Sequence, residues 1–170
     1  MTAPTYDLGN LRGGLRLPAH KRESTAELIK DAPIPSRLAL SIEQHVGSPA
    51  QPVVGVGDCV LKGQLIAQPG GELGAPVHAS SSGTVTGIEQ WPVSCLFGET
   101  APCIVIECDG KDTASPGVAT ADYRTLDPAE LLRRILDGGI VGLGGAVFPT
   151  AHKLMQARTC DIDYLILNGV

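Results

Sequence analysis

Short runs in which apolar residues alternate with polar or small residues fill the first two thirds of the chain. One run covers residues 37–41, and several more lie within residues 53–89, with glycines between them. Such segments, turning at glycine, are typical of strands in a small barrel or sandwich. We therefore predict a β domain over residues 37–120. Residues 1–36, where prolines and glycine pairs interrupt any regular pattern, are expected to be irregular.

A polar stretch follows the last apolar strand, which is expected at residues 104–108. Residues 111–120 contain proline and glycine and few apolar residues, a composition that is typical of linkers. We predict that this stretch connects the β domain to a second part of the chain, which begins near residue 121.

Helical spacing replaces the alternation in this second part. Leucine or isoleucine recurs at residues 131, 132, 135 and 136. Asp127 can cap a helix, Pro128 suits its first position, and Glu130 completes a pattern like a capping box. The helix is expected to end at Gly138 and Gly139.

A glycine-rich loop, a second helix and an apolar strand are expected next. The second helix should begin near Pro149 and run to about Ala157, and the strand should cover residues 163–167. This order indicates the start of an α/β domain at residues 121–170. Because one strand and two helices cannot cover both faces of a sheet, we expect the 170 residues to be part of a longer polypeptide.

Charge and cysteine content narrow the possible functions. The chain has 13 lysines and arginines against 18 acidic residues, a net charge of −5, which argues against a nucleic-acid partner. Its five cysteines show no CxxC spacing, so we predict neither a metal site nor a disulfide framework. No apolar run approaches the roughly 20 residues that a membrane span needs.

The loop between the two predicted helices carries the main candidate for a binding site. Gly142, Gly144 and Gly145 precede the second helix, and Lys153 lies one turn inside it. Glycines let a backbone approach a ligand closely, and a helix N-terminus offers amides to a phosphate. The loop fits neither the dinucleotide fingerprint nor the P-loop. It is either a phosphate or nucleotide cradle or a tight turn between packed helices.

The β region resembles the two half-motifs of the biotinyl/lipoyl carrier fold. Residues 57–58, 62–64 and 79–85 match its turn positions. A carrier displays a modifiable lysine on the hairpin between the halves, but residues 68–74 contain none. We therefore predict a barrel-sandwich hybrid without swinging-arm chemistry, in which Lys62 is a solvated turn residue.

The whole chain resembles the N-terminal part of the C subunit of the Rnf electron-transport complex, also called Rsx. The match rests on four segments in the family's order and spacing: residues 13–21, 44–50, 53–88 and 139–153 with 165–170. In the family, the last segment continues into a Glu-Cys-Glu-Pro run. The resemblance therefore implies a further stretch of chain after Val170.

The glycine loop is also similar to that of the flavin-bearing subunit of respiratory complex I, which holds FMN beside NADH. Carried over by motif position, the implied contacts are Gly142, Gly144 and Gly145 with the FMN phosphate and the dinucleotide, Phe148 with a nicotinamide-cofactor ring, Lys153 with a phosphate and Asn168 with the flavin. Leu143 stands where that loop has an arginine, and Val147 and Ala151 stand where it has glycines.

The resemblance implies a peripheral NADH/FMN-binding subunit on the cytoplasmic face of the bacterial inner membrane. It also implies that the α/β domain starting at residue 121 is Rossmann-like. Its complex couples electron transfer between NADH and ferredoxin to ion translocation. The implied cofactors are FMN, NADH and two 4Fe-4S clusters, whose ligands lie beyond residue 170. The implied partners are the iron-sulfur B subunit of the Rnf complex and its membrane subunits. We predict no catalytic side chain within the 170 residues and little activity from them alone, because flavin and nicotinamide carry the redox chemistry.

Two other functions fit parts of the pattern. The chain could be a component like the A subunit of the sodium-pumping NADH:quinone reductase, although that family lacks an intact glycine loop. It could also be a non-catalytic barrel-sandwich docking module, in which the glycine loop only turns the chain.

Overall fold

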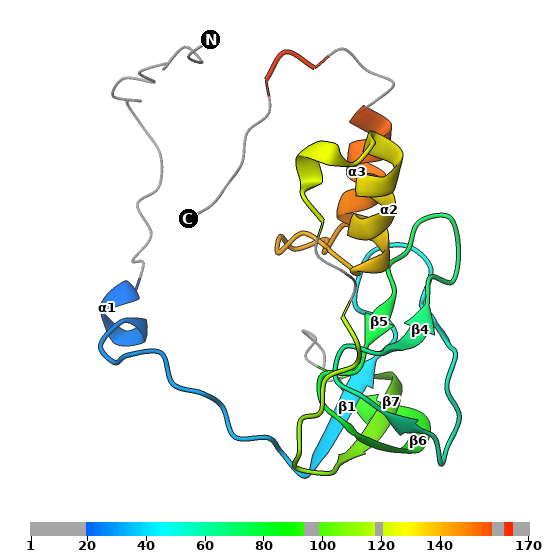
Figure 1. The fold of residues 1–170 in the computed structure, drawn as a ribbon. Coiled ribbons are helices and arrows are strands. Elements are labelled where there is room, and N and C mark those ends of the chain that lie inside the picture. The colour runs from blue at the N-terminus through cyan, green and yellow to red at the C-terminus, as the bar shows by residue number, and fades with distance from the viewer. Residues whose placement is uncertain (1–19, 94–98, 118–120, 158–161, 165–170) are drawn as a thin grey trace. The chain divides into compact units, whose positions relative to one another are not determined.

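The structure is a computed structural model that describes residues 20–93, 99–117, 121–157 and 162–164. The chain divides into two compact units, residues 1–33 and residues 34–170. In the first unit, the described residues form one turn of helix, α1 (Lys21–Ser24), within the segment that we expected to be irregular (Figure 1).

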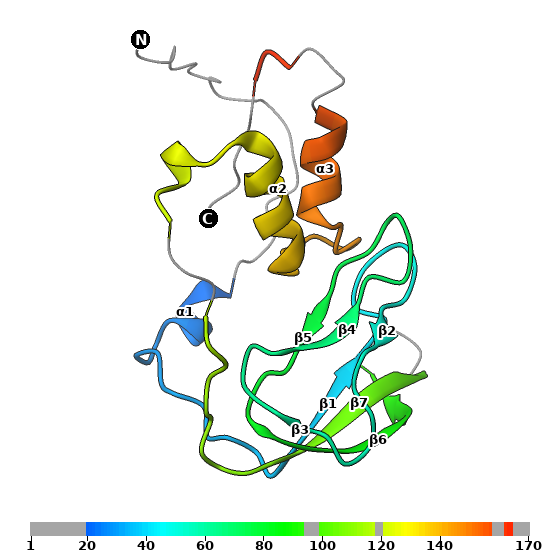
Figure 2. The same cartoon turned by 45° about the vertical axis from the view of Figure 1, so that its right-hand side comes forward.

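The second unit contains two curled antiparallel sheets (Figures 1 and 2). The first has the strand order β1 (Arg37–Ser41), β7 (Thr100–Cys108), β6 (Gly83–Pro92), β3 (Cys59–Val60). The second has the order β2 (Gln51–Pro52), β4 (Leu65–Gln68), β5 (Val77–His78). The predicted small β domain is thereby confirmed.

The core of the barrel is aliphatic. Its largest fully buried side chains include Val60, Ile66, Val85, Ile104 and Ile106. Register explains how they meet, since Val85 on β6 pairs with Ile106 on β7 across the first sheet. The four residues at the centre of β7 are all buried, as expected for a strand that pairs on both edges.

Residues after β7 depart from the predicted linker. The buried Ser82 hydroxyl donates to Asp109 Oδ1 (2.7 Å) and accepts from the Thr113 amide (2.8 Å). The Ser81 hydroxyl donates to Asp112 (2.8 Å). The start of the expected linker is therefore fastened to the barrel. Its polar composition indicated a loop but not the buried partners of that loop.

Lys62 takes part in the same cluster of contacts. It lies in the expected turn between β3 and β4, but its ammonium forms an ion pair with Asp112, so the expectation of a merely solvated lysine was incomplete. The pair and the Ser81 hydroxyl lower the pKa of Asp112. The connection between β4 and β5 contains no lysine, as the sequence shows.

Two helices follow the barrel and lie side by side beyond the end that carries β4 and β5 (Figures 1 and 2). A short 3-10 turn, η1 (Tyr123–Thr125), leads into α2 (Pro128–Asp137), and α3 is Thr150–Ala157. Both predicted helices are confirmed. The strand predicted at residues 163–167 falls mostly outside the described residues, so the Rossmann-like start stays a prediction. No described helix is long and apolar enough to cross a bilayer.

The contribution of the Ser82 hydroxyl to stability can be tested by removing it. Ser82→Ala removes both hydrogen bonds of the buried Ser82 hydroxyl, leaving the Thr113 amide without its acceptor and Asp109 without one donor, which should destabilise the chain by about 1 kcal/mol in urea denaturation. Ser80→Ala, at an exposed neighbouring position, is the matched control and should change stability by less than about 0.5 kcal/mol. Equal stability of the two variants would contradict the assigned role.

Candidate functional site

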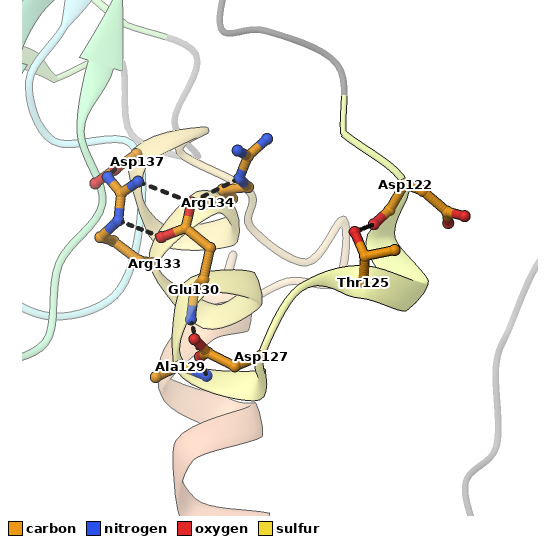
Figure 3. Close-up of polar contacts among 8 residues, drawn as sticks. All are labelled: Asp122, Thr125, Asp127, Ala129, Glu130, Arg133, Arg134 and Asp137. Carbon is orange, nitrogen blue, oxygen red and sulfur yellow. Dashed lines mark hydrogen bonds and ion pairs between the residues drawn. The ribbon is translucent and has the colours of Figure 1, made fainter.

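The glycine loop, residues 138–149, begins at the end of a well-capped helix. Asp127 Oδ1 accepts from the amides of Ala129 (2.8 Å) and Glu130 (2.9 Å), as expected (Figure 3). This bonding satisfies two amides that the first turn of α2 would otherwise leave without partners. The helix that delivers the loop is therefore fixed at its start.

Glu130 does not close the expected capping box. Its carboxylate instead accepts from Arg133 Nε and Nη2 (2.9 Å each) and from Arg134 Nε (2.8 Å), along the helix (Figure 3). Arg133 Nη1 also donates to Asp137 (2.6 Å). These arginine contacts lower the pKa of Glu130 to about 2. The sequence spacing would allow Glu130 to accept either from the Asp127 amide, as in a capping box, or from the two arginines one turn later. In the structure it accepts from the arginines.

Gly139 ends α2 and places the loop against the barrel. Its φ of +64° is left-handed, its amide donates to Leu136 O (2.9 Å), and the Ile140 amide donates to Ile135 O (3.4 Å). This is a Schellman end, for which glycine is favoured. A Cβ at Gly139 would lie 2.8 Å from the Pro76 carbonyl oxygen, so the fold requires glycine here.

The loop then closes on itself as a narrow hairpin. The Gly142 amide donates to Phe148 O (2.9 Å), and the Thr150 amide donates to Ile140 O (3.0 Å). At the tip, the Val147 amide donates to Gly144 O (2.9 Å), and Val147 has a φ of +44°. A left-handed conformation is strained for a β-branched residue.

The tip of this hairpin presents exposed backbone. Residues 143–146 are exposed, and within the described parts of the chain their amides donate no backbone hydrogen bond. A Cβ at Gly144 or Gly145 would meet nothing within 4 Å, and neither residue has a left-handed φ. The fold itself therefore does not require glycine at these two positions.

Most of the expected site residues lie within residues 142–153 of the sequence, and the structure joins two of them by a hydrogen bond. Gly142 and Phe148 face each other across the hairpin through their hydrogen bond, with Phe148 half-buried. Lys153 is exposed on the first turn of α3, and its amide donates to Pro149 O (3.3 Å). Asn168 lies outside the described residues.

Exposed amides, a helix N-terminus and a lysine together suit an anion such as a phosphate. The open space at Gly144 and Gly145 would let the ligand approach the backbone. Over the described residues, no group of three or more His, Cys, Asp or Glu side chains is arranged to hold a metal ion.

Sequence reasoning missed one contact of the loop. The Val46 amide, in the barrel loop after β1, donates to Ala146 O at the hairpin tip (3.2 Å). In the sequence, residues 44–50 stand out only as one segment of the family resemblance. A backbone contact between residues 100 positions apart leaves no trace in composition or periodicity.

Comparison with known proteins places the fold and the loop in one family. Residues 9–111 match the RnfC barrel sandwich hybrid domain. The chain is 46% identical over 157 residues to the C subunit of an ion-translocating oxidoreductase complex of Pseudomonas aeruginosa, covering 92% of this chain and 20% of that protein.

Two further relatives are named for a reaction. The C subunit of a Na⁺-translocating ferredoxin:NAD⁺ oxidoreductase complex of Acetobacterium woodii is 38% identical over 165 residues, covering 95% of this chain and 36% of the relative. The C subunit of a proton-translocating ferredoxin:NAD⁺ oxidoreductase complex of Clostridium ljungdahlii is 40% identical over 163 residues, covering 95% and 35%. The chain thus spans about a fifth to a third of the length of these relatives. Because two of the names differ in the ion, similarity to both assigns neither ion to this chain.

The Glu130 contacts predict an acid-sensitive helix. Because the folded pKa lies below the ordinary value of about 4.3, the ionised carboxylate stabilises the fold above that value, and this contribution is lost as pH falls towards 2. Glu130→Gln removes the charge but keeps the size of the side chain. The stability difference between the parent and this variant, measured by thermal unfolding, should be largest at pH 5–7 and should fall steadily as the pH is lowered to 2.

Because Glu130 lies near the surface, added salt should reduce this difference. Asp109 and Asp112 also have lowered pKa values, but both proteins retain them, so their effect cancels. A difference that does not change with pH would contradict the assignment.

Proposed function

The chain belongs to the RnfC family, and we propose that it contributes the first part of an NADH- and FMN-binding site to the C subunit of an ion-translocating complex. The complex would couple electron transfer between NADH and ferredoxin to ion movement across a membrane. The family match and the names of the relatives support this role. The single observation that carries the binding site is the exposed hairpin tip, whose glycines at 144 and 145 are not required by the fold.

The residues present fit a phosphate-bearing cofactor. The backbone of Gly142, Gly144 and Gly145 would lie along the FMN phosphate and the dinucleotide, with Lys153 adding a point charge. Phe148 would stack on the nicotinamide-cofactor ring, and Asn168 would bind the flavin. When bound, FMN supplies the chemistry of accepting a hydride and passing on single electrons.

The rest of the assembly follows from the same proposal. We place the protein on the cytoplasmic face of the bacterial inner membrane, beside the iron-sulfur B subunit and the membrane subunits. Two 4Fe-4S clusters would be held by residues beyond position 170. Within the chain, we propose that residues 37–120 form the barrel domain and that residues 121–170 begin the α/β domain.

The alternative of a docking module has one observation in its favour. The amides of Gly142, Val147 and Thr150 are used inside the hairpin, as in a plain turn. A carrier version of this alternative is disfavoured, since Lys62 pairs with Asp112 and residues 68–74 contain no lysine. The intact glycine loop argues against a component like the A subunit of the sodium-pumping NADH:quinone reductase.

Gly144→Ala tests whether the glycine serves a ligand. Because its Cβ would meet nothing, the substitution should change stability by less than about 0.5 kcal/mol. In a full-length C subunit that carries residues 1–170, it should weaken FMN binding about tenfold or more, measured by flavin fluorescence titration. Gly117→Ala, also an open position, is the matched control and should leave FMN binding unchanged.

The same titration separates the two functions. Full-length protein that folds but binds no FMN would overturn the proposal in favour of the docking module. We expect residues 1–170 alone to bind FMN weakly or not at all, because the hairpin forms only one wall of the site. Tight binding by residues 1–170 alone would contradict that view.

A further inference from the structure

We propose that His45 is a positioning residue, which fixes the glycine hairpin to the barrel and so sets the geometry of the nucleotide site. The inference rests on the proposed function for its ligand, but not for the contacts that carry it. These contacts join three segments: the loop of residues 44–50, the connection of residues 69–76, and the glycine hairpin. We call the first two segments together the brace.

His45 holds the two parts of the brace together through both ring nitrogens. Nε2 lies 2.9 Å from the amide nitrogen of the buried Ala75 and 3.2 Å from its carbonyl oxygen, and Nδ1 lies 3.0 Å from Val46 O. Because a carbonyl oxygen can only accept a hydrogen bond, Nδ1 must carry the proton and donate to Val46 O. A neutral ring then leaves Nε2 to accept the shorter contact, from the Ala75 amide. One tautomer therefore satisfies both nitrogens and the buried amide.

The next residue carries this link to the glycine hairpin. Val46 accepts from His45 through its carbonyl and donates to Ala146 O through its amide (3.2 Å). The result is a chain of hydrogen bonds from Ala75 through His45 and Val46 to the hairpin tip. Displacing the ring would shift Val46, whose amide bonds to Ala146.

A second contact fixes the base of the hairpin to the same part of the barrel. The backbone of Gly139 lies against the carbonyl of Pro76, the residue after Ala75. A pocket of about 490 Å³ opens beside this contact, between the barrel edge and the end of α2, and includes Leu136 and Asp137 in its lining. The barrel and the helix therefore do not form a continuous interface there, and single contacts at Gly139 and Ala146 can determine where the hairpin lies.

The brace is itself tightly packed. The Ser48 amide donates to Leu73 O (3.0 Å). A Cβ at Gly47 or Gly70 would collide with a backbone carbonyl of the opposing segment, that of Leu73 or Pro49. The connection that would display a lysine in a carrier is thus packed against residues 44–50. Its glycines serve this backbone contact.

The test compares three variants in a full-length C subunit that carries residues 1–170. His45→Phe keeps the ring volume and removes both hydrogen bonds. His45→Gln can still accept from the Ala75 amide and is the rescue. Ser82→Ala is the control for lost stability, since its hydrogen bonds go to residues 109 and 113. The readouts are hydrogen exchange of residues 141–149 without flavin, the FMN dissociation constant, and the urea midpoint.

His45→Phe should raise hairpin exchange and weaken FMN binding, each about fivefold, and His45→Gln should recover most of both. Ser82→Ala should lower the urea midpoint without selectively raising hairpin exchange. If Ser82→Ala matches His45→Phe in hairpin exchange, or if His45→Phe changes neither readout, the inference is wrong. Should His45→Phe not fold, His45→Asn, which is too short to reach Ala75, replaces it with the same expectations.

The two proposals fail in different ways. If the unaltered full-length protein binds no FMN, the proposed function fails, and hydrogen exchange still decides whether His45 positions the hairpin. If it binds FMN and His45→Phe leaves both binding and exchange unchanged, only the positioning role is overturned.

Discussion

The second unit depends on close contact between backbone segments, which is possible because glycines stand at the points of contact. Gly47 and Gly70 let residues 44–50 and 69–76 meet backbone to backbone, and Gly139 lets the end of α2 meet the same part of the barrel. Side-chain cores tolerate some repacking, but a Cβ placed against a carbonyl oxygen leaves no such freedom. These contacts therefore determine where the glycine hairpin can lie.

This constraint divides the glycines of the candidate site into two kinds. Gly139 is required by its left-handed φ and by the adjacent Pro76 carbonyl, whatever the protein binds. Gly144 and Gly145 have open space and no left-handed φ, so the fold alone gives no reason for them. A run of glycines in a sequence mixes both kinds, and only the surroundings of each residue show which glycines a ligand could explain.

The sequence predicted what local chemistry determines. Asp127 caps α2 and Pro128 starts it, and the alternation at residues 37–41 predicted β1 with its bounds. It could not predict contacts between distant residues. Ser82 fastens Asp109 and Thr113, and Lys62 pairs with Asp112, across separations that periodicity does not record. For the site, it predicted the loop but not His45, because a histidine bonded to backbone looks like any polar loop residue.

The contacts between residues 44–50 and 69–76 suggest a reason why a barrel that resembles a carrier is joined to a glycine loop. A carrier needs a mobile, exposed hairpin, and its lysine must reach distant sites. In this chain the equivalent connection is packed against residues 44–50 and bonded through His45, so it is restrained where a carrier must move. A barrel rigid at that point can hold a neighbouring loop in one place. A binding site requires that its loop be held close to one geometry by the residues around it. The absence of a lysine from residues 68–74 and the packing of that connection against residues 44–50 both fit a barrel that holds a neighbouring loop in place, which is the role proposed above.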